Sequence, residues 1–196
     1  MGYAKSTETK HRLLRNTGRL LRTRGFSATG VTDILTTSGV PRGSLYHHFP
    51  DGKEQIAAGA IEQSGHSIVY ALREMIKTAG SLADGIQQFC DYYISELEAS
   101  GYARGCPLAT VALETSATEN PVQQQTAAAF EAIIAVVADQ LLREGFDEPH
   151  DLAVVVVATV EGALVLAKAT RNTEHLAIVR DHIQNQITAA APQSKE

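Results

Sequence analysis

The side chains with the clearest chemical purpose lie together between residues 39 and 49, in the sequence GVPRGSLYHHF. This segment holds arginine, serine, tyrosine and histidine, whose polar groups hydrogen-bond to DNA phosphates and to the edges of bases. The turn-forming residues Gly39 and Pro41 separate it from a short apolar-patterned segment. Two short helices joined by such a turn form a helix-turn-helix, whose second helix enters the DNA major groove. The spacing therefore predicts nucleic acid as the partner.

Individual residues of the two short helices suit different DNA contacts. Arg42 begins the second helix and is the leading candidate for reading a base, because guanine offers the acceptors N7 and O6 to a bidentate arginine. A phosphate contact is an equal alternative for Arg42, since many hydrogen bonds to DNA go to its backbone. Gly43 would allow close approach to the groove, and Ser44 could contact a base edge or a phosphate. On the preceding helix, we expect Thr32 to direct its hydroxyl to a phosphate.

Two adjacent histidines, His47 and His48, could suggest a metal site. Neighbouring residues of a helix point about 100° apart, however, so the two rings do not converge on one ion. The sequence therefore predicts no metal and no other cofactor. For His48, a partly buried packing or capping role is at least as good an interpretation as a DNA contact.

The formal net charge of −5 is unexpected for a DNA-binding protein, but the charge is unevenly distributed. Residues 1–55 contain nine Lys and Arg against four Asp and Glu, whereas the remaining residues hold eight basic and eighteen acidic side chains. This asymmetry predicts a basic head that binds a polyanion and an acidic body. Chance clustering of charge on solvated helix faces is the alternative.

Apolar residues recur at helical spacing through most of the chain, and no long stretch alternates apolar with polar residues. The pattern predicts an all-α protein of about nine helices, with a three-helix head at 1–52 and a body at 53–196. Leu45 and Phe49, four residues apart, would hold the third helix to the core of the head. The expected helices span 7–24, 31–37, 41 or 42–49, 53–78, 81–99, 107–117, 121–144, 150–170 and 174–190.

Cysteine content and hydropathy indicate where the protein works. The two cysteines, Cys90 and Cys106, are too few for a disulfide framework and are expected to be buried, reduced thiols, although a redox role is left open. The segment 152–167 is strongly apolar but short, and Glu161 interrupts it, so it is expected to be a buried helix rather than a membrane span. The N-terminus has no apolar signal sequence. We expect a cytoplasmic protein.

The order of these elements resembles the TetR family of bacterial transcriptional regulators. The resemblance rests on a basic amphipathic helix, the sequence VTDILTTSGVPRGSLYHHF and a long helix that begins with Lys-Glu, and it covers about residues 7–61. Three residues separate Phe49 from Lys53, whereas many members have two. The sequence HHFPDGKEQ and the Gly105-Cys106-Pro107 start of a later helix are similar to the LmrA/YxaF-like branch.

The resemblance implies a function and further DNA contacts. Tyr46 and His47 match family positions that touch DNA, and Lys53 matches a phosphate contact beside a helix N-terminus. Members of the branch are typically repressors of drug-efflux or related genes, released by small aromatic or lipophilic molecules. The implied protein is a homodimer on a palindromic operator, because one short helix reads too few bases. The operator, the regulated genes, the effector and the choice between repression and activation stay open.

The residues of the body are harder to assign, because each apolar side chain could equally belong to the core. The effector pocket is expected to be apolar with a few polar groups, and the candidates for its lining are Phe89, Tyr92, Tyr93, Val111, Phe130, Ile134 and Glu161. Glu161 stands out, since a carboxylate in an apolar run needs a partner from protein or ligand. The dimer interface is expected in the last two helices, with the candidates Leu152, Val156, Val160, Leu176, Val179 and Ile183.

The sequence also bears on two other classes of function. An enzyme is not expected, because the sequence has no phosphate-binding Gly-rich loop, no nucleophile elbow and no Cys/His spacing for a metal. A helical protein-interaction module with a basic face is the alternative to a regulator. Discrimination between DNA sequences would separate these two hypotheses, whereas salt dependence alone would not.

Overall fold

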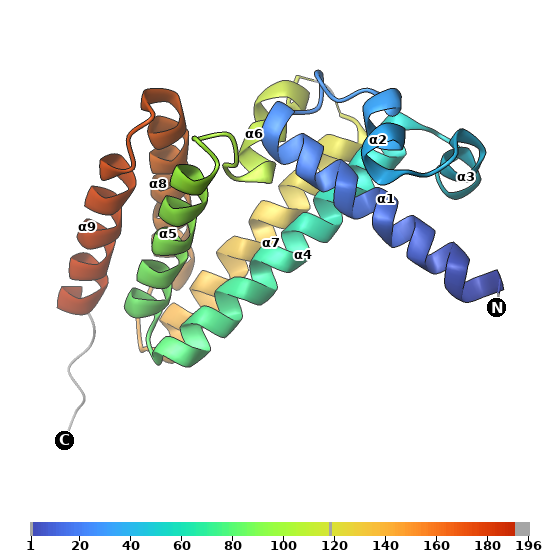
Figure 1. The fold of residues 1–196 in the computed structure, drawn as a ribbon. Helices are drawn as coiled ribbons and strands as arrows, with labels where there is room; N and C mark the ends of the chain where they lie inside the picture. Colours follow the sequence, from blue (N-terminus) through green and yellow to red (C-terminus); the bar gives the residue numbers. More distant parts are fainter. Residues whose placement is uncertain (1, 118, 191–196) are drawn as a thin grey trace. The chain divides into compact units, whose positions relative to one another are not determined.

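The computed structural model describes residues 2–117 and 119–190, with side chains from Ser6 onward. Throughout these residues the chain is helical between its turns and contains no strand, which confirms the predicted all-α class. The described helices are α1 (Gly2–Arg24), α2 (Val31–Ser38), α3 (Arg42–His48), α4 (Lys53–Ala79), α5 (Leu82–Ala99), α6 (Pro107–Thr115), α7 (Pro121–Arg143), α8 (Pro149–Thr170) and α9 (Glu174–Ala190) (Figure 1). The predicted bounds agree within a few residues except at α1, which begins five residues before Thr7.

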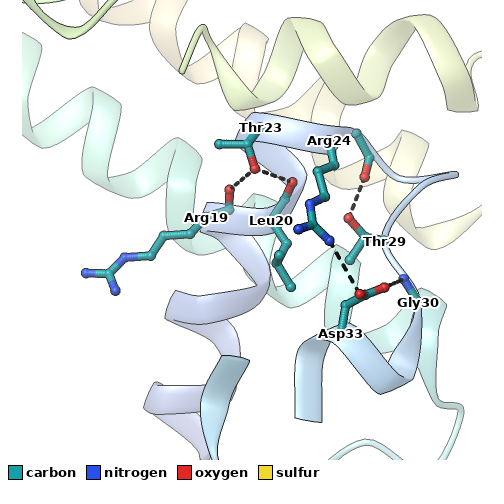
Figure 2. Close-up of polar contacts among 8 residues, drawn as sticks. Arg19, Leu20, Thr23, Arg24, Thr29, Gly30 and Asp33 are labelled. Carbon is teal, nitrogen blue, oxygen red and sulfur yellow. Dashed lines mark hydrogen bonds and ion pairs between the residues drawn. The ribbon is translucent and has the colours of Figure 1, made fainter. Parts of the chain in front are cut away.

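Short-range backbone chemistry sets the limits of the first helices. Gly25, with φ of 80°, ends α1 in a left-handed conformation that glycine adopts without strain. Before α2, the N–H of Gly30 donates to the carboxylate of Asp33 at 2.9 Å, which satisfies a donor at the helix start (Figure 2). Gly39, with φ of 61°, ends α2 and forms the turn before α3.

The described chain divides into two compact units. The head unit comprises Met1–His66 and Cys106–Phe130, and the body unit comprises Ser67–Gly105 and Glu131–Glu196. The helices α4 and α7 each begin in the head unit and end in the body unit. Compact packing does not by itself define function, so the functional division into 1–52 and 53–196 stays a prediction.

A single apolar core holds the first three helices and the start of α4 together in the head unit. Leu45 is fully buried and Phe49 nearly so, which confirms that the inner face of α3 is fixed to this core. The other buried members are Leu13, Leu20, Ile34, Val40 and Ile56. In the same unit, α6 packs against α1. The helix α3 is thus attached to the unit through Leu45 and Phe49.

In the body unit, α9 packs against both α5 and α8 (Figure 1). Arg180 of α9 bonds to Asp91 of α5 at 2.6 Å and to Asp181 at 2.8 Å, and these hydrogen bonds raise the pKa of its guanidinium. Beside this pair, burial raises the pKa of the Cys90 thiol to about 12, with the charge of Asp91 as the second cause. A thiol with so high a pKa is a poor nucleophile at neutral pH.

Two of the described helices, α7 and α8, are long and apolar enough to cross a membrane by length and composition alone, with mean hydropathy of 1.3 and 2.1. Core helices of water-soluble proteins pass the same test. The inner face of α8 is formed by Ala153, Val156, Val157, Val160, Ala163, Leu164 and Ala167, all buried inside the protein. This burial makes one face of α8 part of the core, although only 39% of its apolar window is buried.

Candidate nucleic-acid interface

The surface of α3 carries the polar side chains that the sequence pattern assigned to DNA. Arg42, Gly43 and His47 are exposed, Tyr46 is 38% exposed, and Ser44 is half-buried. Leu45, in the middle of this set, faces the core and is fully buried. The short helix α3 therefore has an apolar face that anchors it to the core and a polar face that is open to an external molecule.

Two details at the start of α3 bear on its approach to DNA. The guanidinium carbon of Arg42 lies 5.6 Å from the centre of the Tyr46 ring, within cation–π range, so one turn of helix orients the arginine. At Gly43, apart from its chain neighbours and the adjoining backbone of α3, no atom of the described residues lies within 4 Å of the position that a Cβ would occupy. Packing inside the protein therefore does not require glycine at this position.

A shallow groove separates α3 from the first turns of α1. Its volume is about 360 Å³, and its lining residues are Ser6, Thr9, Gly43, Ser44, His47 and His48. The sequence pattern identifies neither Ser6 nor Thr9 as a DNA contact, because Ser6 precedes the predicted first helix and Thr9 lies within it without a distinguishing motif. These two hydroxyl-bearing residues extend the polar surface beside α3.

Exposed positive charge continues along α1 from Lys10 to Arg24. Lys10, Arg12 and Arg19 are exposed, and Arg15 is 3.8 Å from Glu8, a spacing typical of a weak surface ion pair. Arg24 is 3.4 Å from Asp33 of α2, so part of the positive charge is neutralised beside the turn (Figure 2). Thr32 is exposed on α2. The helices α1, α2 and α3 thus present basic or hydroxyl-bearing residues to solvent.

Lys53, at the start of α4, contacts the loop between α1 and α2. Its Nζ lies 4.3 Å from the centre of the Phe26 ring and donates to the carbonyl of Ser27 at 3.5 Å. Its side chain is half-buried rather than extended into solvent. A phosphate contact by Lys53 stays a prediction, and in the free protein this lysine binds the loop.

The two neighbouring histidines differ in environment. His47 is exposed, whereas His48 is half-buried, and the ring centres are 5.1 Å apart in an edge-to-face arrangement. Burial, followed by the charges of His47 and Lys10, lowers the pKa of His48. The lowered pKa favours a neutral imidazole at neutral pH. This environment supports the packing interpretation of His48.

The body unit contains a narrow apolar cavity with one carboxylate in its wall. Its volume is about 20 Å³, room for about one water molecule. Its lining residues are Leu72, Ile86, Phe89, Ile133, Val137, Val156, Val157, Val160 and Glu161. A drug-sized molecule needs about 300 Å³ or more of usable space, so ligand binding here requires the helices to separate.

The predicted pocket residues are distributed differently. Phe89 and Glu161 line the cavity. Tyr93 is buried and is not among the lining residues, and its ring centre lies 5.0 Å from that of Phe89. Tyr92 is 45% exposed, and Ile134 is half-buried and outside the cavity lining. Val111 and Phe130 belong to the head unit. The sequence missed most of the lining because its aliphatic residues are indistinguishable from core by pattern.

Four of the six residues predicted for a dimer interface face the protein interior. Val156, Val160, Leu176 and Ile183 are buried within a single chain, so they are not available to a second copy, and Leu152 and Val179 are half-buried. The exposed apolar residues of α8 and α9 are Val154, Val155, Val165, Leu166 and Ile178. Because α8 is apolar on nearly every face, its sequence alone does not distinguish the inner stripe from the outer one.

Similarities to known proteins agree with this geometry. The family model "Bacterial regulatory proteins, tetR family" matches residues 13–60, which include α2 and α3. The model "Transcriptional regulator LmrA/YxaF-like, C-terminal domain" matches residues 83–182. One model thus covers the helix-turn-helix, and the other covers half of the chain.

Individual relatives are similar along most of their length. The HTH-type transcriptional regulator Rv0196 of Mycobacterium tuberculosis is 31% identical, over 94% of this chain and 96% of that protein. LmrA of Bacillus subtilis, an HTH-type transcriptional regulator, is 30% identical over 86% of this chain and 91% of that protein. The reduced form of NemR from Escherichia coli superposes with a TM-score of 0.78 at 26% identity, over 90% and 96%. The chain therefore belongs to the TetR family of helix-turn-helix transcriptional regulators, in its LmrA/YxaF-like branch, and not to a family of enzymes.

Proposed function

We propose that this regulator is a cytoplasmic, bacterial repressor that binds a palindromic operator as a homodimer and is released by a small lipophilic molecule. The observation that carries the proposal is the polar face of α3, which is open to solvent while Leu45 and Phe49 anchor its inner face. In this proposal Arg42, Gly43, Ser44, Tyr46 and His47 contact DNA. Thr32 adds a phosphate contact from α2.

A second copy of the chain fits the exposed stripe of α8. Val155, Ala158, Gly162 and Leu166 recur at spacings of three or four residues and are exposed, so they lie along one face of the helix. Apart from its chain neighbours and the adjoining backbone of α8, no described atom lies within 4 Å of a Cβ built at Gly162, which leaves room for a partner helix to approach closely. The proposed interface therefore lies on this exposed stripe rather than on the buried Val156, Val160, Leu176 and Ile183, and α8 and α9 are the proposed dimerisation helices.

The apolar cavity is the proposed effector site. A lipophilic molecule would be buried against Phe89 and the aliphatic lining, and Glu161 favours one that also carries a cationic or hydrogen-bond-donating group. Leu72 of α4 is part of the wall. A ligand that separates these helices therefore acts on the same helix whose first residue, Lys53, holds the loop before α2.

The proposed response is a shift between two populations of the protein. The effector would bind better to a conformation in which α4 moves the two heads out of register with the operator, and this difference in affinity drives release. Operator and effector then oppose each other's binding by the same factor. Unchanged operator affinity at saturating effector would contradict this mechanism.

Selection of bound duplexes from a random DNA library tests the DNA-binding part. The full-length protein is expected to enrich a palindrome whose half-sites are about 34–36 Å apart, one turn of the double helix. A protein-interaction module with a basic face would bind duplexes at low salt without enriching any sequence. Absence of enrichment would therefore favour that alternative.

Two compounds of similar shape test the effector site. Cyclohexylmethylamine is expected to bind the protein about tenfold more tightly than cyclohexylmethanol, because both compounds can donate a hydrogen bond to the Glu161 carboxylate but only the protonated amine also carries a positive charge. The variant Glu161→Gln should lose this preference and keep its affinity for the alcohol. Glu148→Gln, at the exposed start of α8, is the matched control. Calorimetry provides the affinities, and an unchanged preference in Glu161→Gln would exclude this carboxylate from the site.

A further inference from the structure

The loop between α1 and α2 connects the first helix to the helix-turn-helix. Hydrogen bonds between residues of the loop fix both of its ends. The hydroxyl of Thr29 donates to the carbonyl of Gly25 at 2.7 Å, and the N–H of Thr29 donates to the carbonyl of Phe26 at 3.2 Å. Figure 2 shows this hydroxyl bond beside the ion pair of Arg24 with Asp33. The ends of the loop are therefore fixed by local hydrogen bonds.

The middle of the loop is held from outside. The N–H of Ser27 donates to Oε2 of Glu114 in α6 at 2.5 Å, across 87 residues of sequence. The carbonyl of the same residue accepts from Nζ of Lys53 in α4 at 3.5 Å. Ser27 thus bonds to α6 through its backbone N–H and to α4 through its backbone carbonyl, and all three residues lie within the head unit.

Gly25 provides independent evidence that the loop and Glu114 fit each other. A Cβ built on Gly25 would overlap the carboxylate of Glu114, so any side chain at this position displaces it. The φ of 80° at Gly25 also disfavours other residues. The loop backbone therefore lies directly against the carboxylate rather than near it.

We propose that Glu114 is a positioning residue for DNA binding, which holds the loop by the Ser27 amide and so sets how α2 and α3 lie on α1. The inference rests on the proposed function and names one residue that positions the helices of the proposed DNA-binding surface.

Three variants of the full-length protein test this role on an operator obtained by duplex selection. Glu114→Ala should weaken operator binding about five- to tenfold, the lower range of typical coupling between sites. Glu114→Gln keeps an acceptor for the Ser27 amide and should recover most of this affinity. Glu119→Ala is the control, because it removes the same charge from an exposed position in the head unit.

Amide hydrogen exchange separates positioning from general stability. In Glu114→Ala the Ser27 amide should exchange faster while the amides of α3 and the melting temperature stay as in the wild type. Operator affinity equal to that of Glu119→Ala, or unchanged exchange at Ser27, would overturn the inference. If the wild type itself selects no operator, the proposed function fails instead, so the two failures are distinguishable.

Discussion

The head unit and the body unit use apolar residues in different ways. In the head, buried residues such as Leu45 and Phe49 serve one purpose, the anchoring of a short helix whose other face is polar. In the body, the apolar residues of α8 form part of the core at Ala163, line a cavity at Val157 and lie exposed at Leu166. In the head, an apolar residue type therefore indicates a place in the core. In the body, an apolar residue can lie in the core, line the cavity or face solvent, depending on which way its side chain points.

This difference predicts that substitutions in the two units separate into distinct measurable effects. In the head, anchoring residues should control stability and surface residues should control DNA affinity. In the body, one exposed apolar residue should control assembly, and through assembly DNA affinity. A substitution that changes a property other than the one expected for its position would contradict this comparison.

The largest effect is expected at the exposed stripe of α8. Leu166, 55% exposed, lies in the proposed interface, so Leu166→Glu should place a charge between two copies and give a monomer. Loss of the second head should weaken operator binding by about 100-fold or more. Light scattering after size-exclusion chromatography provides the assembly state. Leu142→Glu, on α7 and 63% exposed, should leave both properties unchanged, and a dimeric Leu166→Glu protein would exclude this stripe.

A substitution in the anchoring face of α3 should act on stability. Leu45→Ala removes a fully buried side chain and should lower the free energy of unfolding by about 2–5 kcal/mol. Urea denaturation followed by circular dichroism measures this loss. If the free energy of unfolding stays as in the wild type, α3 is not fixed by the core as the structure indicates.

On the opposite face of the same helix, Arg42→Ala should act on DNA binding alone. Specific binding is expected to weaken by about 1–3 kcal/mol, with relaxed preference at one base position and an unchanged free energy of unfolding. Binding to a panel of single-base operator variants measures the preference. Uniform weakening across the panel would assign Arg42 to a phosphate instead.

The smallest effect is expected at Gly43, where two properties should change in opposite directions. Alanine favours helix over glycine by roughly 0.5–1 kcal/mol, and the space around a Cβ at this position is empty, so Gly43→Ala should make the protein slightly more stable. The added methyl group should nevertheless reduce operator affinity by obstructing close approach to the groove. Thermal unfolding and fluorescence anisotropy measure the two effects. Operator affinity equal to that of the wild type would remove Gly43 from the interface.

The sequence predicts most of the fold and the polar surface of α3 because these depend on short-range patterns. Turn chemistry at Gly39 and helical spacing at Leu45 and Phe49 are readable from neighbouring residues. The contact of Glu114 with Ser27 is not readable, since it joins residues far apart in sequence through one backbone N–H. The inner and outer faces of α8 are equally unreadable, because valine and leucine occur on both.

The central claim is that α3 reads the sequence of DNA bases. The most direct test compares the affinity for the selected operator with that for a scrambled duplex of the same composition, across a series of salt concentrations. A helix that reads bases should bind the operator about 1,000-fold more tightly or better, and this ratio should persist as both affinities fall with salt. Arg42→Ala should reduce the ratio, whereas Glu119→Ala should not. Equal affinity of the wild type for both duplexes at every salt concentration would contradict the account.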